Sequence, residues 1–218
     1  MTAENHCPGE RICVVLGAMP ISEREAAQIR ALEGALLICA DAGYAQAMRH
    51  GLTPDFTVGD YDSLEGSVTD IEGVKLTFPV EKDDTDAMLA AKEGLARGCR
   101  RFLFYGALGG RLDHTLANIT MLRYLIDFGA TGWLLSEENC VTLLKDGALT
   151  LERDAHYPHL SVFSYEGEAT GVLVQGGKYT PVSHSLNNCF PLGVSNAILG
   201  ERAIISVKRG ILLIVLAA

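Results

Sequence analysis

The chain has 218 residues, 48% hydrophobic and 21% charged, which is enough to bury the core of one large domain or of two small ones and excludes a disordered chain. The formal net charge is −9, from 18 basic and 27 acidic side chains. Since a nucleic-acid binder needs a basic surface, this balance argues against that class of protein.

The six cysteines are scattered, without a C-x-x-C pair or a zinc-type cluster, which predicts free thiols in a reducing compartment. The N-terminal stretch MTAENHCPGE is polar and carries no hydrophobic signal region. The longest apolar stretch, residues 211–218, is far shorter than the ~20 residues of a membrane span. We therefore expect a cytoplasmic protein that does not enter a membrane.

The first two-thirds of the chain alternates short apolar runs with helix-like segments. The runs predict strands at residues 11–16, 36–40, 56–58, 74–80, 101–105 and 132–135. The segments between them predict helices at residues 23–32, 44–50, 85–97 and 112–128. Because the runs are continuously apolar rather than alternating, this part is predicted to be an α/β domain with a parallel sheet covered by helices on both faces.

The sequence pattern changes after about residue 139. From there on, strand-like runs are separated by Gly, Asp and Pro turns, and no helix of ten residues is predicted. Only about 80 residues remain, which suits a small antiparallel β-sandwich. We therefore predict two domains, residues 1–137 and 138–218.

Acidic side chains follow four of the predicted strands directly. They are Asp41, then Asp60 and Asp62, then Asp83, Asp84 and Asp86, and finally Asp113, which stands between Arg111 and His114. Ligands of open parallel sheets bind beyond the carboxyl ends of the strands, where these acids would meet. Mg²⁺ is held by carboxylates together with substrate phosphates, so the pattern predicts a magnesium-dependent phosphate site.

Each acid also has a structural interpretation. Asp84 or Thr85 can cap the helix that follows, and Asp86 suits its first turn. Asp113 can act in the same way at the next helix, and Asp-x-Asp-Ser is common in turns. We interpret Asp84 as a helix cap, whereas four acid-bearing strand ends taken together favour a site.

A glycine-rich segment, YGALGGRLDH, precedes the last predicted helix with Gly106, Gly109 and Gly110. Such a turn lets backbone N–H groups and a helix N-terminus approach a phosphate. Arg111 adds a guanidinium suited to phosphate oxygens, and helical spacing places His114 and Asn118 on the same face. Lys82 supplies a second cation in the acidic loop before Asp86.

Four motifs in order resemble those of bacterial thiamine pyrophosphokinases: GDYDSL at 59–64, KDDTD at 82–86, GALGGRLDHTLAN at 106–118 and GVSN at 193–196. The resemblance extends over residues 14–217. It implies an α/β domain that binds ATP and Mg²⁺, a β-sandwich domain that binds thiamine, and a homodimer with active sites at the subunit interface. The first strand departs from the family by ending in Gly17-Ala18 rather than paired glycines, so that turn is assigned no role.

The resemblance also implies roles for individual residues. Asp60, Asp62 and Asp86 match the acids that hold Mg²⁺, and they are assigned to catalysis together with Arg111 and Asp113. Residues matched to the nucleotide side are Asp41, Lys82, Asp83, Thr85, Gly109, Gly110, His114 and Asn118. Ser195 and Asn196 match a thiamine-side motif that reaches a site built partly by the other subunit.

The implied reaction is transfer of a diphosphate from ATP to the thiamine hydroxyl, giving thiamine diphosphate and AMP. The sequence does not distinguish which aspartate orients or deprotonates that hydroxyl. One alternative is a phosphatase of the haloacid-dehalogenase type, although Leu64 stands where such enzymes usually have Thr or Val. A non-catalytic nucleotide or thiamine sensor is another, which Lys82, Asp86 and Arg111 argue against.

Overall fold

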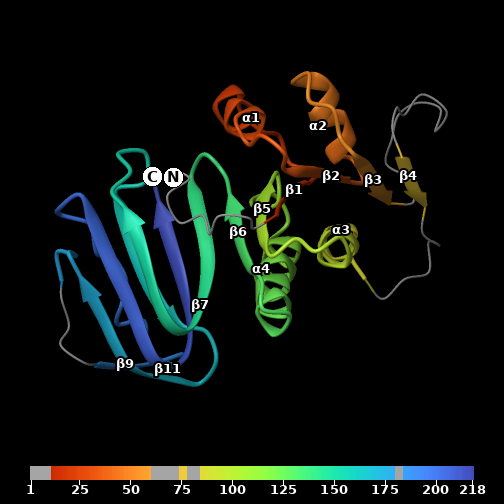
Figure 1. The fold of residues 1–218 in the computed structure, drawn as a ribbon. Coiled ribbons are helices and arrows are strands. Elements are labelled where there is room, and N and C mark those ends of the chain that lie inside the picture. Colours follow the sequence, from red (N-terminus) through yellow and green to blue (C-terminus); the bar gives the residue numbers. More distant parts are fainter. Residues whose placement is uncertain (1–10, 60–73, 78–83, 180–183) are drawn as a thin grey trace. The chain divides into compact units, whose positions relative to one another are not determined.

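The computed structural model describes residues 11–59, 74–77, 84–179 and 184–218, with side chains for all but 74–77. These residues fall into two compact units, one ending at Glu137 and the other beginning at Glu138 (Figure 1). Among them, no helix is both long and apolar enough to cross a membrane.

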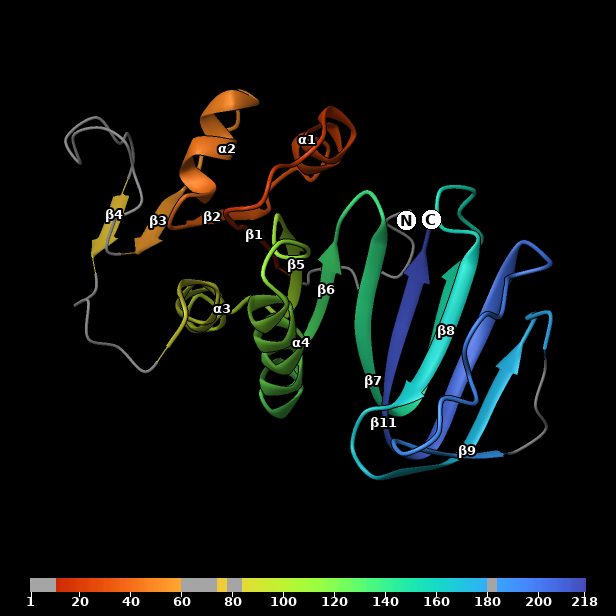
Figure 2. The same ribbon diagram turned by 180° about the vertical axis from the view of Figure 1, so that it is seen from behind.

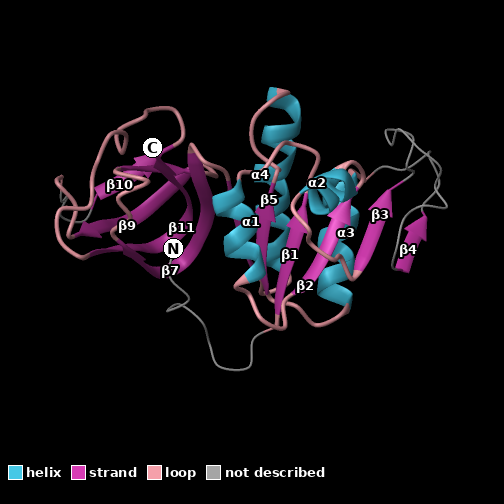
Figure 3. Cartoon of the chain, turned by 90° about the horizontal axis from the view of Figure 1, so that it is seen from above, coloured by secondary structure: helices cyan, strands magenta, loops and turns pink. Residues whose placement is uncertain are grey.

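The first unit contains a parallel sheet. Its strands are β1 (Ile12–Leu16), β2 (Leu36–Ala40), β3 (Phe56–Gly59), β4 (Val74–Thr77), β5 (Arg101–Tyr105) and β6 (Thr131–Leu135). They lie in the order β6-β5-β1-β2-β3-β4 (Figure 1), and every neighbouring pair is parallel. Figure 3 shows the part of this order from β5 to β4. Several strands are buried along almost their whole length, which explains why their sequences are continuously apolar.

Four helices accompany this sheet, namely α1 (Glu23–Arg30), α2 (Gly43–Arg49), α3 (Asp86–Ala96) and α4 (Leu112–Asp127). Figures 1 and 2 show α1 and α2 on one side of the sheet and α3 and α4 on the other. Helix α1 begins in a capping box, in which Ser22 Oγ accepts from the Glu25 N–H and Glu25 accepts from the Ser22 N–H. Phe102, Phe104 and Ile38 are fully buried in the core beneath the helices.

The strand order places a topological switch point between β1 and β5. From β1 the chain proceeds through α1 and α2 to β2 and β3 on one side, whereas α3 leads back to β5 on the other side of β1. Loops that leave the carboxyl ends of two such strands diverge and open a crevice, where ligands of α/β sheets usually bind. The position of the site therefore follows from the order of the strands.

The second unit is antiparallel. Its strands are β7 (Asn139–Glu152), β8 (His159–Ser164), β9 (Glu168–Gln175), β10 (His184–Asn187) and β11 (Arg202–Ala217). Strand β11 pairs with β7 along its length, and its other edge pairs first with β9 and then with β8. The register shifts between Val207 and Ile211, where Gly210 has a φ of 117° and donates its N–H to Asp146 Oδ1 at 2.8 Å.

Most predicted elements occur within two residues of their predicted bounds, and the chain combines a parallel with an antiparallel part as expected. Helix α1 is shorter than predicted because it ends at Arg30 rather than residue 32. Strand β4 is described only as far as Thr77, and the remainder of that predicted strand lies outside the described residues. Strand β10 was not predicted, since HSLN is short and largely polar.

The packing of α3 against β1 and β5 generates a stability prediction. A Cβ on Gly94 would lie 2.5 Å from Phe102 Cε1 and 2.9 Å from Cys13 Sγ, and both neighbours are fully buried. We expect Gly94→Ala to lower the free energy of unfolding by roughly 1 kcal/mol, because overpacking costs ~1–3 kcal/mol and the gain in helix propensity is only ~1 kcal/mol.

Urea denaturation followed by circular dichroism measures this change. Gly200→Ala is the matched control, because nothing lies within 4 Å of a Cβ at that position. The control should stay within about 0.5 kcal/mol of the parent chain. A Gly94→Ala midpoint at or above that of the parent would contradict the expected overpacking.

Candidate active site

A cavity of about 500 Å³ lies at the carboxyl ends of β1, β2 and β5, next to the switch point. We call it the strand-end cavity. Its lining comes from the ends of those strands, from the loops after them, and from the N-terminal parts of α3 and α4. Eight of the predicted site residues line it: Asp41, Thr85, Asp86, Gly109, Arg111, Asp113, His114 and Asn118. Residues that are far apart in the sequence thus line one cavity.

Asp41 stands directly after β2 in a strained backbone conformation, with a φ of 45°. Its N–H donates to the Val58 carbonyl at 2.8 Å, which holds the residue against β3. Its Oδ1 atom is buried and has no hydrogen-bond partner among the described residues. Because a buried carboxylate oxygen without a partner is costly, this atom marks a place for a cation or a donor from a ligand.

The N-terminus of α3 presents Thr85 and Asp86 to the cavity. Thr85 is the N-cap, and its hydroxyl accepts from the Met88 N–H at 3.2 Å. The interpretation of Asp84 as the cap is therefore wrong. Asp84, which precedes the N-cap, instead pairs with Lys92 Nζ of α3 at 2.6 Å and raises the pKa of that lysine. Asp86 is the first residue of α3, where the helix dipole favours a carboxylate.

The glycine-rich turn, residues 106–110, connects β5 to α4. Gly106, Gly109 and Gly110 all have positive φ values, between 63° and 92°. The turn is held from α4, because Asn118 Nδ2 donates to the Ala107 carbonyl at 2.8 Å and Thr115 Oγ1 to the Gly109 carbonyl at 3.4 Å. Asn118 thus shapes the turn as well as lining the cavity. Gly110 is the one predicted residue of this turn that does not line the cavity.

Arg111 and Asp113 form an exposed bidentate ion pair at the start of α4. Arg111 Nε donates to Asp113 Oδ1 at 3.1 Å, and the second bond, from NH2 to Oδ2, is 2.5 Å. The hydrogen bond from Arg111 lowers the pKa of Asp113 below its ordinary value, and Asp113 raises the pKa of Arg111. Arg111 occupies the N-cap position of α4 and makes no side-chain capping bond, whereas Asp113 lies in the first turn, where its Oδ1 also accepts from the His114 N–H at 3.0 Å.

Four predicted residues, Asp60, Asp62, Lys82 and Asp83, lie outside the described part of the chain. Among the residues that are described, no three His, Cys, Asp or Glu side chains form a metal-binding cluster. Of the three predicted metal ligands, only Asp86 is among the described residues, and it lines the cavity together with Asp41.

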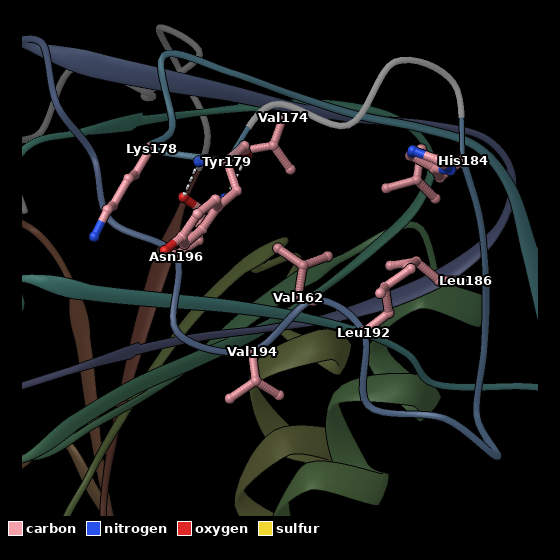
Figure 4. Close-up of a pocket in the computed structure, with 11 residues that line it drawn as sticks. Val162, Val174, Lys178, Tyr179, His184, Leu186, Leu192, Val194 and Asn196 are labelled. Atoms are coloured by element: carbon pink, nitrogen blue, oxygen red, sulfur yellow. Dashed lines mark hydrogen bonds between the residues drawn. The ribbon is translucent and has the colours of Figure 1, made fainter.

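The predicted thiamine-side residues lie in the second unit, next to an apolar pocket of about 580 Å³ (Figure 4). Asn196 lines this pocket, but its amide is engaged by the backbone. Oδ1 accepts from the Tyr179 and Ala197 N–H groups at 3.0 and 2.9 Å, and Nδ2 donates to the Tyr179 carbonyl at 2.7 Å. Ser195, with a φ of 62°, does not line the pocket, and its N–H donates to Ser161 Oγ at 3.3 Å. In this structure Asn196 therefore fixes the path of the chain at Tyr179.

The prediction missed Ala18 and Met19, which line the strand-end cavity from the loop after β1. The signal was the position of this loop, directly beyond the carboxyl end of a central parallel strand. Its sequence contains no charged residue, so it did not stand out.

Residues 31–131 match the family model described as "Thiamin pyrophosphokinase, catalytic domain". The thiamine pyrophosphokinase of Bacillus subtilis (strain 168) is 28% identical over 192 residues, which cover 84% of this chain and 87% of that protein. Residues 31–131 therefore correspond to a thiamine pyrophosphokinase catalytic domain. The matched region includes all eight predicted residues around the strand-end cavity.

Solved structures show that the fold is shared with thiamine pyrophosphokinases. The crystal structure of the Bacillus subtilis protein superposes with a TM-score of 0.86 at 22% identity, over 96% of this chain and 99% of that one. The crystal structure of the Geobacillus thermodenitrificans protein superposes with a TM-score of 0.82 at 24% identity, over 95% of this chain and 97% of that one. Members of the thiamine pyrophosphokinase family are diphosphotransferases, and these comparisons give no support to a phosphatase or a sensor.

The ion pair at the start of α4 generates a prediction about titration. The folded-state pKa of Asp113 is depressed, so the pair is formed above the unfolded-state pKa and is lost as the pH falls through the folded-state value. Replacing Arg111 by Gln should raise the pKa of Asp113 toward the ordinary aspartate value of 3.8. Carbon-detected NMR of the carboxyl group measures that pKa.

Arg123→Gln is the control, because Arg123 forms a similar pair with Asp127 later in α4. It should leave the Asp113 titration unchanged. An Asp113 pKa that is the same in Arg111→Gln as in the parent chain would show that the pair does not persist in solution.

Proposed function

We propose that the strand-end cavity is where this chain transfers a diphosphate from ATP to the hydroxyl of thiamine, giving thiamine diphosphate and AMP. The observation that carries the proposal is the convergence of eight predicted residues on one cavity, within the region matched by the family model. An acidic rim also suits the cationic thiazolium ring of thiamine, because opposite charges attract most strongly where water is scarce.

The charge of the cavity supports a role for Mg²⁺. The charged side chains that line it include the carboxylates of Asp41, Asp86 and Asp113 but only one guanidinium, that of Arg111. A polyanion such as ATP would be repelled by this lining unless a cation accompanied it. The unpartnered Asp41 Oδ1 is a hard oxygen of the kind that Mg²⁺ prefers, so the described residues fit the ion.

We assign Mg²⁺ binding to Asp60, Asp62 and Asp86. When bound, the ion would offset the negative charge of the phosphates. The glycine-rich turn, Arg111 and Lys82 would bind and orient the phosphates. One aspartate would orient the thiamine hydroxyl or accept its proton. Positioning and electrostatics suffice for such a transfer, without a covalent enzyme intermediate.

The nucleotide side of the proposed site also includes Asp83, Thr85 and His114. We further propose that residues 1–137 form the domain that binds ATP and Mg²⁺, and residues 138–218 a β-sandwich domain that binds thiamine. The protein would act in the cytoplasm as a homodimer with active sites at the subunit interface. Large apolar side chains exposed in the second unit support an interface there: Tyr179, Phe190, Leu192, Val194 and Leu199.

The deciding experiment is incubation of the protein with ATP, Mg²⁺ and thiamine, followed by chromatographic separation of the products. We expect thiamine diphosphate and AMP in equal amounts, with no turnover when EDTA removes the metal. Formation of ADP and inorganic phosphate, or absence of turnover with Mg²⁺ present, would overturn the proposal.

Two substitutions test the assigned metal ligands. Asp62→Asn and Asp86→Asn should each lower kcat on the order of 100-fold or more, since loss of about 3 kcal/mol of charge stabilisation corresponds to that factor. Both variants should still unfold cooperatively. Steady-state kinetics at saturating Mg²⁺ measures the effect.

Asp84→Asn is the matched control, because Asp84 is close in sequence but pairs with Lys92 and does not line the cavity. Its kcat should stay near that of the parent chain. Parent-like rates for Asp62→Asn or Asp86→Asn would remove that residue from the metal site.

A further inference from the structure

Met19 is the one large apolar side chain among the described residues that line the strand-end cavity. The other lining residues are Gly and Ala or carry polar side chains. Met19 is partly buried, and it follows β1 in the loop that had no assigned role. The other walls of the cavity consist of small or polar residues, so the presence of a large, flexible thioether at this position calls for a physical explanation.

The backbone around Met19 is fixed against the end of β5. The Gly17 N–H donates to the Tyr105 carbonyl at 2.8 Å, and the Met19 N–H to the Gly106 carbonyl at 3.0 Å. A Cβ on Gly106 would lie 2.7 Å from the Met19 carbonyl oxygen, so the two chain segments touch through their backbones. The Met19 side chain therefore starts from a well-defined point beside the glycine-rich turn.

From that point the side chain extends along the turn to Gly110. A Cβ on Gly110 would lie 2.9 Å from Met19 Sδ and 3.2 Å from Met19 Cε, and no other described residue outside the immediate sequence neighbours comes within 4 Å. The same methyl group is 3.8 Å from the corresponding position on Gly109. The end of the turn is thus in contact with the thioether, in the space that a side chain at position 110 would take.

The two hydrogen bonds from α4 hold the turn only at Ala107 and Gly109. Gly109 and Gly110 both have positive φ values, and a glycine pair has wide conformational freedom. Arg111 follows Gly110 directly and is the N-cap of α4. Any displacement of Gly110 would consequently move the guanidinium and the first N–H groups of the helix.

We propose that Met19 is a positioning residue for ATP: its thioether packs against Gly110 and keeps the glycine-rich turn and Arg111 in the arrangement that receives the phosphates. This inference rests on the proposed function and adds to it a residue from the β1 loop. The thioether acts through Gly110 and Arg111, and it takes no part in the transfer of the diphosphate.

The test compares Met19→Ala with Met19→Leu. Titration calorimetry with the non-transferable analogue α,β-methylene-ATP and Mg²⁺ gives a dissociation constant without turnover. We expect Met19→Ala to weaken this binding and raise the KM for ATP roughly tenfold, less than the ~100-fold that a displacement of about 1 Å can cost. The KM for thiamine and the melting temperature should change little. Met19→Leu should restore most of the affinity, because leucine has a similar volume and also packs against the turn.

Met48→Ala is the control for loss of a methionine, since Met48 is exposed and does not line the cavity. It should bind the analogue like the parent chain. Parent-like affinity in Met19→Ala would overturn the inference. Equal rises in both KM values with a lower melting temperature would also overturn it, because they would show a merely structural role. If the parent chain itself failed to bind the analogue, the proposed function would fail as well.

Discussion

The close approach of two backbones at the switch point is the constraint on which the rest of the site depends. A Cβ on Gly17 would lie 2.5 Å from the Gly106 carbonyl oxygen, and one on Gly106 would lie 2.8 Å from the Gly17 carbonyl oxygen. Both positions must therefore be glycine for the loops after β1 and β5 to touch. This contact brings Met19 to the glycine-rich turn, and the turn carries Arg111 and the start of α4.

A second constraint is the balance of charge in the strand-end cavity. The sheet order collects carboxylates from the ends of several elements, and this places like charges near one another. Repulsion between these carboxylates costs free energy in the absence of a ligand. A further cost arises at Asp41, whose Oδ1 atom is buried and has no hydrogen-bond partner among the described residues. Clustered, unpaired charges of this kind are typical of ligand-binding sites, where the ligand supplies the missing partners. A cation together with a phosphate ester would supply them here.

The fold was largely predictable because the strands of the first unit are buried and continuously apolar, and because helix-like segments separate them. The convergence of acids on one cavity followed from the carboxyl-end rule for parallel sheets. What the sequence patterns could not supply depended on three-dimensional geometry. Asp84 and Thr85 are both good N-caps, and only the backbone path selects Thr85. Asn196 carries a motif resemblance, but its amide is engaged by Tyr179, which is 17 positions earlier. Met19 and Gly110 come into contact only through tertiary packing, and no local sequence pattern predicts that contact.

The Arg111–Asp113 pair bears on how a phosphate can bind to an arginine that already has a partner. Asp113 accepts from Nε and from one terminal nitrogen of the guanidinium, which leaves the donors of the other terminal nitrogen for a ligand. The carboxylate therefore orients the guanidinium and still leaves some of its N–H donors available to a ligand. An arginine held in this way loses less conformational entropy when a phosphate binds than a free one would. The pair nevertheless removes most of the net charge of Arg111, so the attraction for phosphate has to come from backbone N–H groups and from accompanying cations. In the proposed function, Arg111 therefore has a directional role, and compensation of the phosphate charge falls to the proposed cation.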